Sequence, residues 1–230
     1  MAFLELSQVS FSYPRRQRPA VAEIDLTLDR GGITAVMGPN GSGKTTLTRL
    51  MMGILRPDAG SIRLKNRSLR EYSLAEIGRC IGYVFQNPDQ QLFCNTVAEE
   101  IGFGLLHLGW EREAISERVE FYLNYFELAA YRYVFPLHLS RGEKQRLAIA
   151  AVLAGEPGFL ILDEPTAGLD AYRKGLLIDY LKKIAGLGRG VVFVSHDAGF
   201  VKRATDRVIC LESGQICGDT GQVGDPGYAD

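Results

Sequence analysis

A glycine-rich stretch that ends in a lysine and two threonines has the residue types and spacing that bind phosphate. Residues 38–45 fit the pattern G-x-x-x-x-G-K-[ST], between an apolar run at 33–37 and a segment of helical periodicity. Glycines allow the backbone to point successive N–H groups at phosphate oxygens, beside the positive N-terminus of a helix. The predicted nucleotide contacts are Gly38, Pro39, Asn40, Gly41, Ser42, Gly43, Lys44, Thr45 and Thr46.

Two side chains of this phosphate loop have specific chemical roles in the prediction. Lys44 is a catalytic candidate because it places a positive charge beside the reacting phosphates, and Thr45 offers an oxygen to Mg²⁺. The loop alone indicates only a nucleotide, because kinases, GTPases and helicase-like motors share the pattern.

Two acidic residues follow another apolar run further along the chain. Asp163 and Glu164 come directly after residues 159–162, at the carboxyl end of a predicted parallel strand, where open α/β sheets bind ligands. We predict that Asp163 holds Mg²⁺ through water and that Glu164 polarises the attacking water. The alternative is a strand that merely ends in a solvated acid pair, and the phosphate loop favours the functional interpretation.

Two further polar side chains also end apolar runs. His196 follows the run at 191–194 and lies 33 positions after Asp163, which leaves room for one crossover helix. We predict that it contacts the terminal phosphate or orients water. Gln86 follows the run at 81–85, and its amide oxygen is a catalytic candidate and a candidate Mg²⁺ ligand. His107 and His138 are interpreted as surface or core residues.

The string LSRGEKQRLA at residues 139–148 resembles the signature motif of ATP-binding cassette (ABC) proteins. That family also has a tyrosine that stacks on adenine, a Q-loop glutamine, a D-loop and a switch histidine, which match Tyr13, Gln86, residues 166–170 and His196. These motifs and the phosphate loop occur in family order over almost the whole chain. The resemblance implies ATP and Mg²⁺ as cofactors and ATP hydrolysis as the reaction.

The same resemblance implies that one chain holds only half of each site. In that family, two domains bind head to tail, so that the signature motif of one closes over the ATP on the phosphate loop of the other. The residues expected to contact a partner's nucleotide are Ser140, Gly142, Glu143 and Asp170. The implied partner is a second ABC ATPase domain, either another copy or a paralogue. Arg141 stands where the family usually has glycine, and we expect it to be tolerated.

Residues 86–93, 96–101 and 103–104 look like the ATPases of energy-coupling factor importers, which take up vitamins and cobalt or nickel ions. Such proteins join a transmembrane coupling subunit at a groove beside the Q-loop, so transmembrane subunits are a second implied partner. We expect Pro88 in an exposed turn, and we expect Leu92, Phe93 and Val97 to seat a helix of that subunit. The alternative is that these apolar residues pack the chain's own helical lobe.

Two other functions remain open. A non-transport ABC protein acting on ribosomes or DNA usually has paired cassettes, a coiled-coil insertion or basic surfaces, which are not evident here. The chain has 26 Lys and Arg against 27 Asp and Glu, and these charges are spread along it, so no nucleic-acid partner is predicted. A regulatory ABC ATPase with little turnover is suggested only by Arg141.

A largely parallel sheet is needed to bring these side chains together, and the hydrophobic pattern predicts one. Short apolar runs without alternation are typical of strands covered on both faces, and they occur at 33–37, 81–85, 159–162 and 191–194. Alternating residues predict an N-terminal antiparallel β lobe, and they occur at 4–6, 24–29 and 61–65. Helical periodicity at 47–55 stops before Pro57.

The predicted fold is α/β: a phosphate-loop NTPase core with a mostly parallel sheet, the antiparallel β lobe, and an α-helical lobe inserted at about 87–154. Residues 1–230 form one ABC nucleotide-binding domain in this prediction. With no apolar run of eighteen residues and no signal peptide, the chain is expected to be cytoplasmic. The family resemblance further implies that it is peripheral on the cytoplasmic face of the cell membrane. After 207–211 the sequence predicts a glycine-rich, hairpin-like tail to residue 230, and we expect a monomer without nucleotide.

Overall fold

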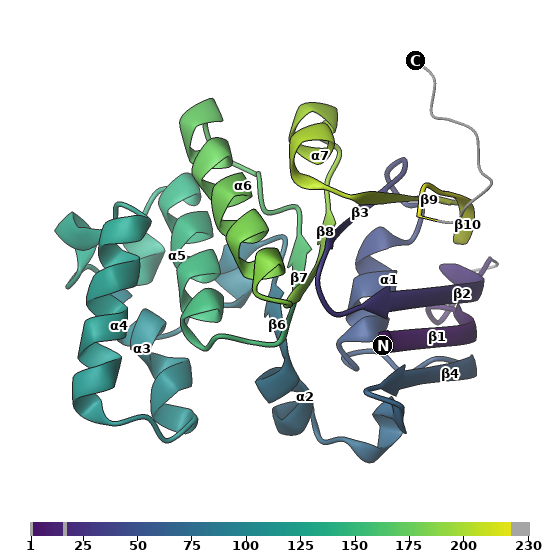
Figure 1. Ribbon diagram of the computed structural model, residues 1–230, viewed down its shortest axis with the longest axis horizontal. Coiled ribbons are helices and arrows are strands. Elements are labelled where there is room, and N and C mark those ends of the chain that lie inside the picture. The colour runs from purple at the N-terminus through teal and green to yellow at the C-terminus, as the bar shows by residue number, and fades with distance from the viewer. Residues whose placement is uncertain (1, 16–17, 222–230) are drawn as a thin grey trace.

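The computed structural model describes residues 2–15 and 18–221, which form two β-sheets with helices around them (Figure 1). The strands of the larger sheet are β3 (Ile33–Met37), β6 (Ile81–Val84), β7 (Phe159–Asp163), β8 (Gly190–Val194), β9 (Arg207–Glu212) and β10 (Gln215–Asp219). The strands of the smaller sheet are β1 (Ala2–Phe11), β2 (Val21–Asp29), β4 (Ala59–Leu64) and β5 (Arg67–Ser68).

The pairing of these strands confirms the predicted fold class. The larger sheet has the order β10-β9-β3-β8-β7-β6, and all its neighbours are parallel except β9 and β10. The smaller sheet has the order β2-β1-β4-β5 and is antiparallel throughout. The predicted hairpin-like tail corresponds to β9 and β10 as far as residue 221, and its last residues, 222–230, lie outside the described part of the chain.

The α-helices are α1 (Lys44–Met51), α2 (Leu74–Cys80), α3 (Val97–His107), α4 (Arg112–Tyr125), α5 (Arg141–Ala154), α6 (Ala171–Gly186) and α7 (Ala198–Ala204). Single 3₁₀ turns are η1 (Leu69–Glu71), η2 (Pro88–Gln90), η3 (Ala129–Tyr131) and η4 (Pro136–His138). Every element between 87 and 154 is helical, in line with an inserted helical lobe. Because α5 packs against both α3 and β6, the boundary of that lobe stays a prediction.

The larger sheet is buried on both faces, which explains its unalternating apolar strands. Along β7, Phe159 and Ile161 pack towards α1 and the smaller sheet, whereas Leu160 and Leu162 pack towards α5 and α6. Figure 1 shows α1 between the two sheets, and α3 and α4 at the end of the molecule away from the smaller sheet. The carboxyl ends of β3, β6, β7 and β8 therefore meet at one edge.

Helix α1 is shorter than predicted. The apolar periodicity of 47–55 suggested a helix as far as Leu55, but α1 ends at Met51. Gly53 then adopts a left-handed conformation (φ 73°) that does not continue a right-handed helix, and Ile54 is exposed. The apolar residues after Met51 belong to the connection to β4.

Candidate functional site

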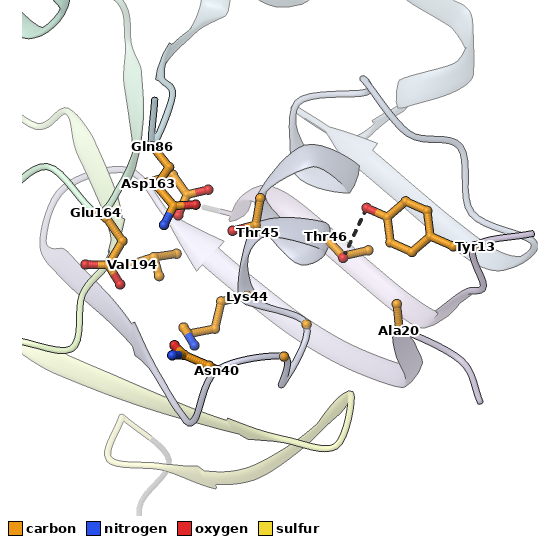
Figure 2. A pocket seen from close by; sticks show the side chains of 12 residues that line it. Tyr13, Ala20, Asn40, Lys44, Thr45, Thr46, Gln86, Asp163, Glu164 and Val194 are labelled. Atoms are coloured by element: carbon orange, nitrogen blue, oxygen red, sulfur yellow. Dashed lines mark hydrogen bonds between the residues drawn. The ribbon is translucent and has the colours of Figure 1, made fainter. Parts of the chain in front are cut away.

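Residues predicted from separate motifs line one pocket of about 310 Å³ at the carboxyl edge of the larger sheet (Figure 2). The phosphate loop enters it from β3, Gln86 follows β6, and the acidic pair follows β7. The lining residues are Tyr13, Ala20, Asn40, Gly41, Gly43, Lys44, Thr45, Thr46, Gln86, Asp163, Glu164 and Val194. The sheet topology thus brings residues 150 positions apart in the chain (13 and 163) to a common site.

The phosphate loop needs glycine at two positions because the chain passes other backbone very closely there. A Cβ atom on Gly38 would lie 2.0 Å from the carbonyl oxygen of Leu211, and one on Gly43 would lie 2.2 Å from that of Ala20. Both glycines also have positive φ, 146° and 104°. Glycine adopts such backbone conformations at little steric cost. The loop can therefore curve tightly, and no side chain at these two positions blocks its N–H groups.

Lys44 is held by the loop that precedes it. Its Nζ donates hydrogen bonds of 2.8 Å each to the carbonyl oxygens of Gly38 and Pro39, and the residue is 9% exposed. An ammonium group retained at this point lies on the pocket wall, at the first residue of α1. The positive charge and the N-terminus of α1 therefore favour an anionic ligand at the same place.

Asp163 and Glu164 contribute two buried oxygens that lack a hydrogen-bond partner. Asp163 is 1% exposed and Glu164 is 8% exposed, and Oδ1 of the first and Oε2 of the second have no partner. Burial raises the pKa of Asp163, and the neighbouring charge of Glu164 contributes to the rise, although a hydrogen bond with Thr45 opposes it. Unpartnered buried carboxylate oxygens are costly, so the site favours a cation or a polar ligand.

The donor set fits Mg²⁺. Figure 2 shows Thr45, Gln86 and Asp163 in the same part of the pocket, and all three offer oxygen atoms, which this ion prefers. Among the described residues, no cluster of three His, Cys, Asp or Glu side chains forms a cage for a metal. An ion held by few protein ligands keeps places for water and phosphate oxygens, which is how Mg²⁺ is usually bound with nucleotides.

Glu164 is positioned by unusual backbone geometry that sequence reasoning did not anticipate. Its φ is 52°, in the left-handed region that non-glycine residues seldom adopt, and its N–H donates to the carbonyl oxygen of Val194 at 3.0 Å. Its Oε1 lies 3.0 Å from Nδ1 of His196. The histidine side chain is 81% exposed and does not line the pocket. It therefore contacts Glu164 from the solvent-exposed side and not from within the pocket.

Tyr13 lies on the pocket wall near the second threonine of the phosphate loop. Its hydroxyl is 3.3 Å from Oγ1 of Thr46 (Figure 2), so the ring stands beside the start of α1. Ala20 and Val194 also line the pocket and were not predicted. No sequence motif marks either residue, because an alanine and the last valine of a buried strand add apolar surface to the pocket but no charged or reactive group.

The residues expected to act on a partner's nucleotide are all outside the pocket lining. Ser140 caps α5: its N–H and its hydroxyl donate to Oε2 of Glu143 at 2.8 and 2.7 Å. Asp170 caps α6 and accepts from the N–H of Arg173 at 2.8 Å. Arg141 is exposed, and its side chain makes no hydrogen bond or ion pair with the described residues. One chain therefore does not bring its two sets of predicted contacts together.

The expectation for the segment after Gln86 was partly wrong. Pro88 is buried, and Leu92 and Val97 are 5% and 0% exposed because they pack into the chain's own helical core. Phe93 alone of the predicted docking residues is exposed, at 63%. Its loop is held by the buried carboxylate of Glu100, which accepts the N–H of Phe93 at 2.9 Å.

The family assignment follows from comparison with known proteins. A family model described as "ABC transporter" matches residues 21–167, which is more than half of the chain. The chain belongs to the ABC transporter family. This ABC protein is 41% identical over 213 residues to a putative ABC transporter ATP-binding protein of Pyrococcus furiosus, a match that covers 93% of this chain and 81% of that protein.

Other relatives of this ABC protein are more specific in name or much longer. It is 40% identical to the energy-coupling factor transporter ATP-binding protein EcfA of Methanothermobacter thermautotrophicus, over 93% of this chain and 69% of that protein. It is 42% identical to a putative ABC transporter ATP-binding protein of Methanosarcina acetivorans over 86% of this chain but only 32% of that protein. The chain thus spans about a third of the length of some curated relatives.

Solved structures agree with the assignment. The chain is similar to cbiO1 of Clostridium perfringens, part of the ABC transporter complex cbiONQ (TM-score 0.81, 33% identity, covering 95% of this chain and 88% of that one). It is also similar to a dimeric ATP-binding cassette in a post-hydrolysis state with ADP and Pi (TM-score 0.86, 27% identity, covering 94% and 97%). The chain is an ATP-binding ABC-type ATPase domain. None of its described helices is long and apolar enough to cross a membrane.

Proposed function

We propose that this ABC ATPase drives an importer of the energy-coupling-factor type, which moves a metal ion or a vitamin through separate membrane subunits. The similarity to EcfA and to cbiO1, part of a transporter complex, supports this class. In the proposal, the chain works at the cytoplasmic face of the membrane and closes on a second cassette domain when ATP binds.

The main observation in support of ATP-driven pairing is that the predicted nucleotide contacts lie in two separate places on one chain. The phosphate pocket and its two unpartnered carboxylate oxygens belong to one region, whereas Ser140 and Asp170 lie outside its lining. In the proposal, a second cassette supplies the missing contacts, and a similar solved cassette is a dimer bound to ADP and Pi. ATP then lies between two chains, and binding favours the closed pair.

The predicted site residues each have a proposed role in binding or hydrolysis. The phosphate loop and Lys44 bind the phosphates, Thr45, Gln86 and Asp163 would hold Mg²⁺, and Tyr13 stacks on adenine. The ion supplies charge neutralisation at the phosphates. Glu164 accepts a proton from the attacking water and is oriented by His196, 3.0 Å away. Ser140, Gly142, Glu143 and Asp170 contact the nucleotide held by the partner.

A surface beside the Q-loop suits the membrane partner. An open groove of about 630 Å³ lies between α3 and α4, and Phe93, Phe103 and Leu106 line it with exposed apolar side chains. Phe93 and Phe103 stack edge to face with ring centroids 4.7 Å apart. An exposed apolar patch of this kind is typical of a protein interface, so we propose that a helix of the coupling subunit occupies it.

Replacing Glu164 by Gln tests the proposal. Glutamine preserves the size of the side chain but accepts no proton, so ATP hydrolysis should fall by roughly 10²–10⁴-fold, the usual contribution of a general base. ATP should still bind and should accumulate a dimer, measured by phosphate release and by light scattering with ATP and Mg²⁺. Normal turnover in this variant would remove Glu164 from its role, and failure to dimerise would count against ATP-driven closure.

A further inference from the structure

Glu127, two residues after α4, lies between two arginines, one on α5 and one on α6, the helices that carry the predicted partner-contacting residues at their N-termini. One carboxylate oxygen, Oε2, accepts from Nη2 of Arg173 at 2.8 Å and from its Nε at 3.2 Å. The same oxygen lies 3.5 Å from Nη1 of Arg146. Arg146 is on α5, three residues after Glu143 of the signature motif, and Arg173 is on α6, three residues after Asp170.

Both arginines are tied further into their surroundings. Arg146 is 7% exposed, and its Nη1 donates to the carbonyl oxygens of Phe126 at 2.5 Å and Glu127 at 3.2 Å. Arg173 pairs through Nη1 with the carboxylate of Asp170. A continuous chain of charges therefore runs from the signature helix through Glu127 to the loop of Asp170.

A second contact joins the same two segments through backbone alone. A Cβ atom on Gly142 would lie 2.6 Å from the carbonyl oxygen of Gly168, and Gly168 has a positive φ of 76°. The first turn of α5 thus lies directly against the loop that leads to Asp170. Neither segment can shift far without the other, because close-packed backbone transmits displacement.

We propose that Glu127 is a positioning residue that keeps the turn of Ser140 and the loop of Asp170 in register within one chain, so that both reach the partner's nucleotide together. This inference rests on the proposed ATP-dependent pairing. Glu127 itself does not line the pocket, so it acts through Arg146 and Arg173.

The chain contains a matched control for this arrangement. Glu156 also follows a helix, has a positive φ of 50° against 54° for Glu127, and lies between two arginines, Arg118 and Arg189. Its side chain is 37% exposed, against 42% for Glu127. Glu156 touches neither the signature turn nor the loop of Asp170 in any hydrogen bond or ion pair of the described residues.

The first experiment compares Glu127→Gln with Glu156→Gln by amide hydrogen exchange in the nucleotide-free chain. In each variant, glutamine removes the negative charge that lies between two arginine guanidinium groups. Both variants should therefore lose a similar, small amount of thermal stability. Only Glu127→Gln should speed exchange several-fold in residues 140–144 and 166–170. Equal exchange in the two variants at these segments would mean a merely structural role and would overturn the proposal.

The second experiment measures dimer formation in the background of Glu164→Gln. Adding Glu127→Gln should raise the ATP concentration for half-maximal dimerisation several-fold, while the affinity of the monomer for a fluorescent ATP analogue stays unchanged. Adding Glu156→Gln should change neither quantity. Adding Arg173→Gln to Glu127→Gln should cause little further loss, because both substitutions break the same chain of charges.

The outcomes separate this inference from the proposed function. If Glu164→Gln alone fails to dimerise at any ATP concentration, the proposed pairing fails, and hydrogen exchange still decides whether Glu127 links the two segments. If Glu164→Gln dimerises and the Glu127 and Glu156 variants then respond alike, the pairing stands and the role of Glu127 is refuted.

Discussion

Asp163 shows how a functional side chain sets the pH dependence of stability. Its burial raises the folded-state pKa above the ordinary value of 3.8. Between these two pKa values the folded protein binds more protons than the unfolded chain, so the stability of the nucleotide-free protein falls as pH rises through that window. The loss is complete above the raised pKa.

Asp163→Asn should accordingly stabilise the nucleotide-free protein while impairing Mg²⁺-dependent ATP hydrolysis. Asparagine removes the buried charge, and each kcal/mol relieved should raise the Tm by about 2–4 °C in a chain of this size. Thermal unfolding followed by circular dichroism checks the gain, which should shrink as the pH is lowered through the raised pKa.

Asp219→Asn is the control for this prediction. Asp219 is also buried, at 7% exposed, but the hydrogen bond from Arg207 lowers its pKa. Its replacement leaves the guanidinium without its buried carboxylate partner, so the Tm should fall instead of rising. A fall in Tm for both variants would show that the Asp163 carboxylate is not destabilising in the absence of ligand.

Helices α3 and α4 present an apolar face that no other described part of the chain covers. Leu92 and Val97 are buried in the core below it, whereas Phe93 and Leu106 are 63% and 60% exposed. The backbone of the Phe93 loop is anchored because Glu100 accepts the N–H groups of both Phe93 and Cys94. An aromatic side chain on an anchored loop beside an open groove is suited to binding a partner helix at a low entropic cost.

Phe93→Ser should weaken attachment to the membrane subunits without unfolding the chain. Burial of one phenylalanine contributes about 1.5–3 kcal/mol, so binding to membrane vesicles of the native cells should weaken about tenfold or more. Sedimentation with the vesicles measures this. Phe121→Ser is the control, because Phe121 is exposed on α4 but does not line the groove. Equal losses for the two variants would place the contact elsewhere.

At the scale of the molecule, the main consequence of the fold is that the two sets of predicted nucleotide contacts lie apart on one chain. The phosphate pocket opens at the edge of the larger sheet, and the caps of α5 and α6 carry Ser140 and Asp170 outside it. In a symmetric pair, each chain would complete the site of the other. Two defective chains can then restore each other only if their defects lie in different halves.

Mixing Lys44→Ala with Ser140→Ala should therefore recover ATPase activity that neither variant has alone. Mixed dimers hold one intact site and one doubly defective site, so an equal mixture should regain about a quarter of the wild-type rate, from random pairing of subunits in two-fold dimers. A phosphate-release assay of the separate and mixed proteins checks this. No recovery, although the chains pair, would mean that Ser140 acts within its own chain.

The sequence by itself determined the motifs and most of the elements that carry them. The phosphate loop, the acidic pair and the unalternating strands each depend on a few consecutive residues, whose backbone preferences and burial pattern are local. Strand β3 ends at Met37 and strand β7 ends at Asp163, close to the points where the apolar runs stop and the predicted site residues begin. The helix predicted at 47–55 was an exception, because α1 ends at Met51 and Gly53 follows with a left-handed backbone while the apolar pattern continues.

Only the tertiary structure decided which side chains share a surface. Leu92, Phe93 and Val97 look alike in sequence, yet packing of the helical lobe buries two of them and exposes the third. Glu127 carries no motif, and its partners lie 19 and 46 positions away, so nothing local marks it. Such contacts depend on how distant segments pack, and burial and charge pairing across that packing are set by the whole fold.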